Sequence, residues 1–232
     1  MVTLNAEKLS LQDIHRLLRL QKLPTGNYAD VLSLEPLTEY EQQELTQIAS
    51  DFENYLSPGK VSEGLVKVLT VYPLLRLAGF YRYPFELNLE ETIARISVVD
   101  EDTEITGRFD ILAINREAER NGQREAFWVL VIEAKNSSIA VNAALPPLLA
   151  YAYEGLDDQN LVWGLVTNGV NYQFVRLQRE EPPTYQPLPT LHLFERDRAL
   201  QLLQALKAIC KLQRNGSSDS LKSTICNLKS KI

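Results

Sequence analysis

Two apolar stretches in the middle of the chain each carry charges where a buried strand would carry none. The first is Gly107-Arg108-Phe109-Asp110-Ile111-Leu112-Ala113-Ile114, and the second is Phe127-Trp128-Val129-Leu130-Val131-Ile132-Glu133-Ala134-Lys135. Strands this apolar lie at the centre of a sheet and are covered on both faces. A charge there is costly unless it is paired, hydrogen-bonded or bound to a metal. Asp110, Glu133 and Lys135 therefore form either an ion-pair network or an active site.

The spacing of these residues favours the active site. Glu133 and Lys135 are two positions apart, so both side chains leave the same face of the strand. Between the two stretches lies Asn121-Gly122, a hairpin-turn signal, and antiparallel pairing through it would bring Asp110 towards Glu133. Two carboxylates that converge at a strand end can hold Mg²⁺, which keeps several of its waters. A lysine beside them can orient an attacking water or offset charge on a phosphate.

The order of the periodic segments predicts an α/β fold with a mixed central sheet flanked by helices. We expect residues 1–58 to form a small N-terminal helical subdomain, residues 59–212 the core, and residues 213–232 a linker and an amphipathic tail. In the first part, Ser10 caps one helix, and Thr38 with Glu41 has the capping-box pattern of a second.

The remaining elements follow from changes of hydrophobic period. A third helix should bury Leu65 and Val68, kink at Pro73 and end at Gly79. The proline-rich stretch 179–190 is expected to be a loop. The other expected helices cover residues 139–153 and 195–212, and the expected strands are 85–89, 93–99, 107–114, 127–135, 161–167 and 172–177, the last two joined at Asn168-Gly169.

Composition limits the classes of function. The net charge of −6 speaks against tight stand-alone DNA binding, but leaves room for a small basic patch or for delivery to DNA by a partner. Two histidines and two cysteines speak against a His-rich metal site, a Ser-His-Asp triad, a zinc site or a disulfide framework. No secretory signal is visible, and no apolar run approaches the roughly 20 residues of a membrane span. We therefore expect a cytoplasmic protein without membrane contact.

The ordered set of motifs resembles the PD-(D/E)xK nuclease superfamily. It consists of Gly107-Arg108-Phe109-Asp110, then Val131-Ile132-Glu133-Ala134-Lys135, then Thr167-Asn168-Gly169. Within that superfamily it is most similar to the N-terminal nuclease domain of type I restriction enzyme motor subunits. The resemblance covers roughly residues 60–178 and implies a restriction-endonuclease-like fold.

The resemblance implies a Mg²⁺-dependent DNA endonuclease of the restriction type, with Mn²⁺ as a substitute metal. Asp110 and Glu133 would bind the metal, Lys135 would position a water, and Glu63 stands where an early helical glutamate often completes the family's metal site. Arg108 and Asn168 are candidate substrate contacts. The implied partners are DNA and a restriction-system or helicase protein, and a homo-oligomer is left open.

One departure from the family pattern supports other hypotheses. The subgroup carries a Gln-x-x-x-Tyr element on the next helix, whereas Pro147 precedes Tyr151 by four positions and Leu149 precedes Tyr153. This departure, the acidic charge and the lack of a helicase motor favour a catalytically inactive nuclease-fold protein that binds nucleic acid or another protein. In a third hypothesis, Asp110, Glu133 and Lys135 form only a structural ion-pair network.

Overall fold

The centre of the molecule is a mixed β-sheet. The computed structural model describes residues 2–93, 96–98, 102–117, 119–120, 123–124 and 127–229, without side chains for 119–120, 123–124, 127 and 213–229. The strands of the large sheet are β2 (Gln21–Lys22), β3 (Phe85–Leu89), β6 (Ile111–Asn115), β9 (Phe127–Ala134), β10 (Leu161–Thr167), β11 (Asn171–Gln178), β12 (Thr184–Pro187) and β13 (Leu191–His192). Their order is β2-β12-β11-β10-β9-β6-β3, and β13 also pairs with β11. The predicted mixed α/β class is confirmed.

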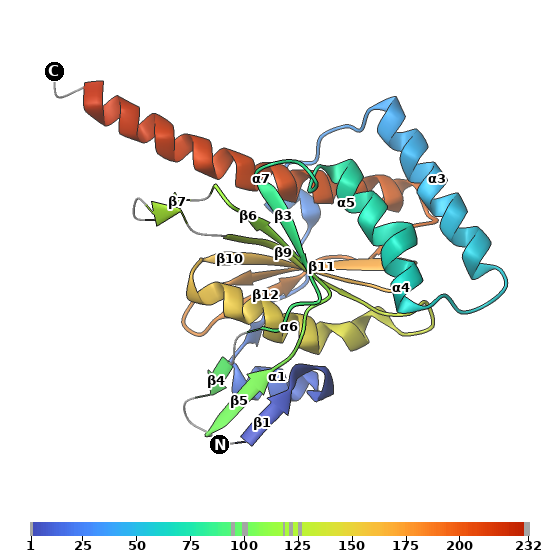
Figure 1. Cartoon of the computed structure of the whole chain (residues 1–232), viewed down its shortest axis with the longest axis horizontal. Helices are drawn as coiled ribbons and strands as arrows, with labels where there is room; N and C mark the ends of the chain where they lie inside the picture. The colour runs from blue at the N-terminus through green and yellow to red at the C-terminus, as the bar shows by residue number, and fades with distance from the viewer. Residues whose placement is uncertain are drawn as a thin grey trace.

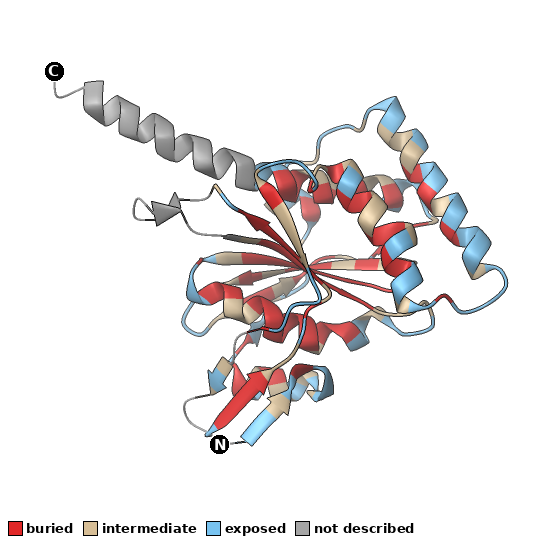
Figure 2. Cartoon of the chain, in the orientation of Figure 1, coloured by how far each residue is buried: buried red, intermediate tan, exposed pale blue. Residues whose placement is uncertain are grey.

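Helices cover both faces of this sheet (Figure 1). On one face lie α2 (Tyr28–Val31), α3 (Glu39–Leu56), α4 (Glu63–Val66), α5 (Tyr72–Ala78) and α7 (Arg196–Lys229). On the other face lie α1 (Leu11–Leu17) and α6 (Leu145–Glu154). Leu130 and Ile132 of β9 pack in the first hydrophobic cluster and Val131 in the second. Successive side chains of a strand point to opposite faces, so β9 is buried from both sides (Figure 2).

The predicted hairpin partners are correct. β6 and β9 pair antiparallel, with Ile111 opposite Ile132, and β10 and β11 pair antiparallel around Asn168-Gly169. The turn residues Asn121 and Gly122 lie outside the described part, but the flanking β7 (Glu119–Arg120) and β8 (Gln123–Arg124) pair antiparallel. β10 runs parallel to β9 after the α6 crossover. The 3₁₀ turn Val141–Ala144 precedes α6, which begins later than expected because the two prolines occupy its first turn.

Residues 1–58 do not form a separate helical unit. Their first strand, β1 (Val2–Asn5), pairs with β5 (Thr103–Thr106), which in turn pairs with β4 (Ile96–Val98) in a small second sheet. Their second strand, β2, joins β12 at the edge of the large sheet. The capping boxes of α1 and α3 are present as predicted. The apolar face of α3 is buried against the rest of the core. This packing stabilises α3, since an isolated amphipathic helix is only marginally stable in water.

The third helix buries a different face from the predicted one. Leu65 and Val68 are 39% and 56% exposed, and Val66, Lys67 and Thr70 are buried in their place. The segment Lys67–Val71 between α4 and α5 is π-helical. Pro73 has no N–H with which to close an α-helical bond to the Leu69 carbonyl, which accounts for the irregular turn at this place. Gly79 ends the helix at a φ of 102°, as expected.

Three boundaries differ from the sequence predictions. The first central strand begins at Ile111, so Asp110 stands immediately before it. The proline-rich stretch 179–190 contains β12, since pairing with β11 supplies hydrogen bonds that the local sequence does not reveal. The last helix, α7, continues through residues 215–219, where a linker was expected.

The contact between the Asn168-Gly169 turn and α3 gives a test of how this helix packs on the sheet. Gly169 has a φ of 86°, and a Cβ there would clash with the ring of Phe52 in α3. We expect Gly169→Ala to lower the free energy of unfolding by about 2–4 kcal/mol, because the substitution adds backbone strain and a core clash. Gly64→Ala is the matched control, since a Cβ on Gly64 meets nothing within 4 Å. Urea denaturation measures both, and equal stabilities of the two variants would contradict the docking of α3 on this turn.

Candidate active site

The end of β9 holds Asp110 in place. Asp110 immediately precedes β6, and the antiparallel register sets it beside Glu133. The Ala134 N–H donates to Asp110 Oδ2 at 2.7 Å. The Asp110 carbonyl accepts from the Glu90 N–H at 3.0 Å. The predicted approach of Asp110 to Glu133 is therefore present in the structure.

Glu133 is a buried carboxylate of which one oxygen is hydrogen-bonded and the other is not, among the described residues. Its side chain is 2% exposed, and its Oε1 accepts from Lys135 Nζ at 2.7 Å. Its Oε2 is buried without a hydrogen-bond partner among the described residues. Burial and the negative charge of Asp110, opposed by Lys135, raise the pKa of Glu133 to about 8. Burial alone would lower the pKa of Lys135, but the charge of Glu133 and its hydrogen bond raise it.

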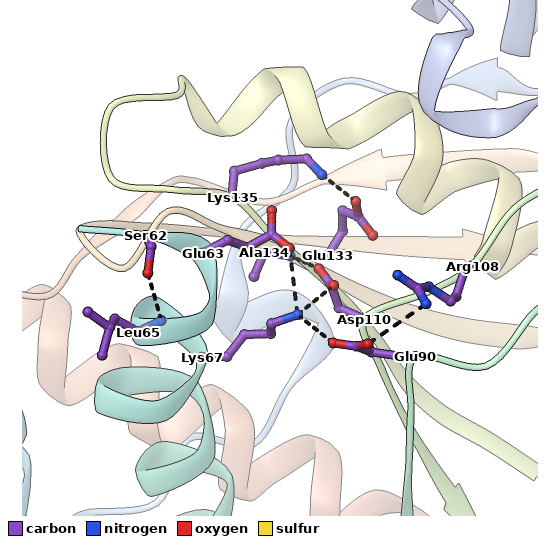
Figure 3. A network of polar contacts seen from close by, with 10 residues as sticks. All are labelled: Ser62, Glu63, Leu65, Lys67, Glu90, Arg108, Asp110, Glu133, Ala134 and Lys135. Carbon is purple, nitrogen blue, oxygen red and sulfur yellow. Dashed lines mark hydrogen bonds and ion pairs between the residues drawn. The ribbon is translucent and has the colours of Figure 1, made fainter. Parts of the chain in front are cut away.

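Glu63 reaches the same site from the helix layer. It is the first residue of α4, where the Ser62 hydroxyl accepts from the Leu65 N–H and caps the helix. The Glu63 Oε1 lies 3.6 Å from Lys67 Nζ, and the Glu63 side chain is 40% exposed. Its negative charge also contributes to the raised pKa of Glu133. The three predicted carboxylates thus surround one region (Figure 3).

Lys67 lies at the centre of this region and is not predicted from the sequence. Its side chain is 9% exposed, and Nζ donates to Asp110 Oδ1 at 2.9 Å and to Glu90 Oε1 at 3.4 Å. Burial alone would lower the pKa of Lys67, but the hydrogen bond and charge of Asp110, together with Glu63 and Glu90, raise it. The Glu63-x-x-x-Lys67 spacing on a helix was the available signal.

Glu90 extends the network to the surface. It follows β3 directly, has a φ of 53°, and carries a side chain that is 54% exposed. Its Oε2 lies 3.9 Å from Nη1 of Arg108, whose side chain is 62% exposed. Arg108 therefore stands at the solvent side of the site, next to a carboxylate that also contacts Lys67 (Figure 3).

Asn168 is predicted as a substrate contact, and in the structure its side-chain amide forms hydrogen bonds with the backbone around the turn. Its Nδ2 donates to the Ile139 carbonyl at 2.9 Å. Its Oδ1 accepts from the Val170 and Asn171 N–H groups at 3.1 and 2.9 Å. These bonds give Asn168 a structural role, because the reversal between β10 and β11 needs an acceptor for its backbone donors.

Tyr151 packs under the site from α6. It is fully buried, and a Cβ on Gly107 would lie 2.6 Å from its ring. Burial, with a further contribution from the charge of Glu133, raises the pKa of Tyr151. Tyr151 is therefore a packing residue of α6, and Gly107 is needed for its close approach.

Within the described residues, no group of three or more His, Cys, Asp or Glu side chains is arranged to hold a metal ion. Comparison of the chain with protein-family models and with curated proteins finds no match.

No helix in the described part of the chain is long and apolar enough to cross a membrane.

The raised pKa of Glu133 predicts a pH-dependent stability. Because the folded state holds this proton up to about pH 8, against a reference value of 4.5, ionisation of Glu133 costs stability as pH rises between these values. The neutral variant Glu133→Gln should match the wild type near pH 4.5. Above pH 8 it should exceed the wild type by at least about 1 kcal/mol, or roughly 2–4 °C in Tm.

Thermal unfolding without divalent cations across this pH range measures the effect. Glu53→Gln, on the exposed face of α3, is the matched control and should show no such pH dependence. A constant difference between Glu133→Gln and the wild type at every pH would contradict the buried, high-pKa carboxylate.

Proposed function

We propose that this protein is a Mg²⁺-dependent DNA endonuclease of the restriction type, related to the PD-(D/E)xK nuclease superfamily. The observation that carries the proposal is the buried Glu133 carboxylate, which has one oxygen without a partner among the described residues and lies beside Asp110. Two neighbouring carboxylates repel each other, and a divalent cation between them would relieve that repulsion. Lys135, bonded to Glu133, supplies the lysine of the proposed motif.

The donor set fits magnesium. Mg²⁺ is bound in many phosphoryl-transfer sites by one or two carboxylates together with waters and substrate phosphates, so a larger protein cluster is not required. Asp110 and Glu133 would supply these oxygens, and Glu63, the proposed third carboxylate, contacts Lys67, which also contacts Asp110. When bound, the metal would lower the pKa of a water and offset the charge of the phosphate under attack.

The chain's own residues have separate proposed roles. The Lys135 side chain is 23% exposed and bonded to Glu133, so it can orient a water that enters from solvent. Arg108, at the exposed side, can bind a backbone phosphate of DNA. The net charge of −6 favours delivery to DNA by a restriction-system or helicase partner in the cytoplasm.

A catalytically inactive nuclease-fold protein is the second candidate function. The Lys67 ammonium group lies 2.9 Å from Asp110, so this carboxylate has a counter-ion without a metal. Pro147 and Leu149 stand where the family's helical glutamine would be. Such a protein would bind nucleic acid or another protein through the same fold without hydrolysing it.

Plasmid cleavage in Mg²⁺ or Mn²⁺ tests the first function. We expect Asp110→Asn and Lys135→Ala each to lower the cleavage rate by at least about 100-fold, because the first removes a proposed metal ligand and the second removes the group proposed to position the water. The matched controls are Asp51→Asn and Lys60→Ala, which change exposed residues outside the site. Circular dichroism checks that every variant remains folded.

Three results would decide between the two functions. Loss of cleavage in the site variants alone supports the endonuclease. Unchanged cleavage by folded Asp110→Asn would sink the assignment of the site. Absence of cleavage by the wild type in either metal, with DNA binding retained in a gel-shift assay, supports the inactive binding protein.

A further inference from the structure

We infer that Lys67 is a resident counter-ion of the candidate metal site and competes with a divalent cation for Asp110. The inference rests on the proposed metal site and concerns its regulation. The ammonium group neutralises Asp110 when no metal is bound, and a metal binds by displacing it. Lys67 thereby sets the cation concentration at which the site fills.

The hydrogen bonds of Asp110 lead to this conclusion. Its Oδ2 is held by the Ala134 N–H at 2.7 Å, and its Oδ1 by Lys67 Nζ at 2.9 Å. The Ala134 bond ties the Asp110 carboxylate to the end of β9. A cation that binds Oδ1 must displace the Lys67 ammonium group, and a cation at either oxygen of Asp110 is repelled by its positive charge.

Lys67 and Lys135 each pair with one of the two carboxylates. Lys135 pairs with Glu133 at 2.7 Å, and Lys67 pairs with Asp110. The two lysines approach from opposite sides of Ala134 (Figure 3). Among the described residues, the Glu133 Oε2 is the one oxygen of this pair of carboxylates to which no donor is bonded. A cation can therefore use this oxygen without displacing a donor, whereas at Asp110 it competes with Lys67.

A second partner for the displaced ammonium group is already in place. The Glu90 Oε1 lies 3.4 Å from Lys67 Nζ, and the Glu90 side chain is 54% exposed against 13% for Asp110. Glu63, at 3.6 Å and 40% exposed, is another acceptor on the same helix. A short movement of the flexible lysine stem therefore keeps its charge paired while Asp110 becomes free.

Mn²⁺ binding to the full chain, followed by isothermal titration calorimetry, tests the competition. Lys67→Met keeps the length of the buried stem and removes the charge. We expect it to bind Mn²⁺ roughly tenfold more tightly than the wild type, because the cation then meets no positive charge at Asp110 and has no ion pair to break. Lys60→Met is the matched control, an exposed lysine seven positions earlier whose loss should leave the affinity unchanged.

The possible results separate this inference from the proposed function. Tighter binding by Lys67→Met alone supports the competition, and a merely structural lysine would give weaker binding instead. Equal or weaker binding by the variant, with saturable binding by the wild type, would overturn the inference and leave the metal site standing. No binding by either protein overturns both.

A crystal structure of the wild type with Mn²⁺ provides a second test if Lys67→Met does not fold. Anomalous scattering locates the metal. We expect Mn²⁺ at Asp110 and Glu133, with the Lys67 Nζ moved from 2.9 Å to beyond hydrogen-bond distance of Asp110 Oδ1. Mn²⁺ bound at both carboxylates beside an intact Lys67–Asp110 pair would overturn the inference.

Discussion

The candidate site depends on the cost of burying the Glu133 carboxylate at the end of a strand covered on both faces. Lys135 satisfies one oxygen at 2.7 Å, and no described group satisfies the other. Asp110 lies alongside, held by the Ala134 N–H, and its charge adds to the cost. A buried polar group without a partner is expensive, and the cation that we propose at Asp110 and Glu133 would offset this cost.

The site also joins the two layers of the molecule. The face of β9 that carries Glu133 and Lys135 also carries Val131, which packs against the α6 layer. Lys67 and Glu63 come from the helical segment on the other face, and Lys67 bonds to Asp110 across the end of the sheet. A change in the charge at Asp110 therefore alters its contacts both with the end of β9 and with Lys67 of the helical segment. The same geometry serves either proposed function, since a metal or the Lys67 ammonium group can neutralise Asp110.

Local patterns predicted more of this structure than long-range contacts did. The charged residues at Asp110, Glu133 and Lys135 stood out because the surrounding strands are apolar, and their pairing followed from strand geometry. The capping boxes of α1 and α3 were readable because they are formed by neighbours in sequence. Lys67 was missed because the π-helical segment Lys67–Val71, which precedes Pro73, makes the buried face depart from regular helical spacing. β1 and β2 were missed because their partners lie about 100 residues or more away in sequence.

Proton release on metal binding tests most directly the proposal that Asp110 and Glu133 form a cation site. Calorimetric titration of the wild type with Mn²⁺ at pH 7, in two buffers of different ionisation enthalpy, counts the protons released. The pKa of Glu133 is raised to about 8 without metal, so binding at this carboxylate should release about one proton. Glu133→Gln should release none. Saturable Mn²⁺ binding without proton release, or no binding by the wild type, would contradict a cation site built on Asp110 and Glu133.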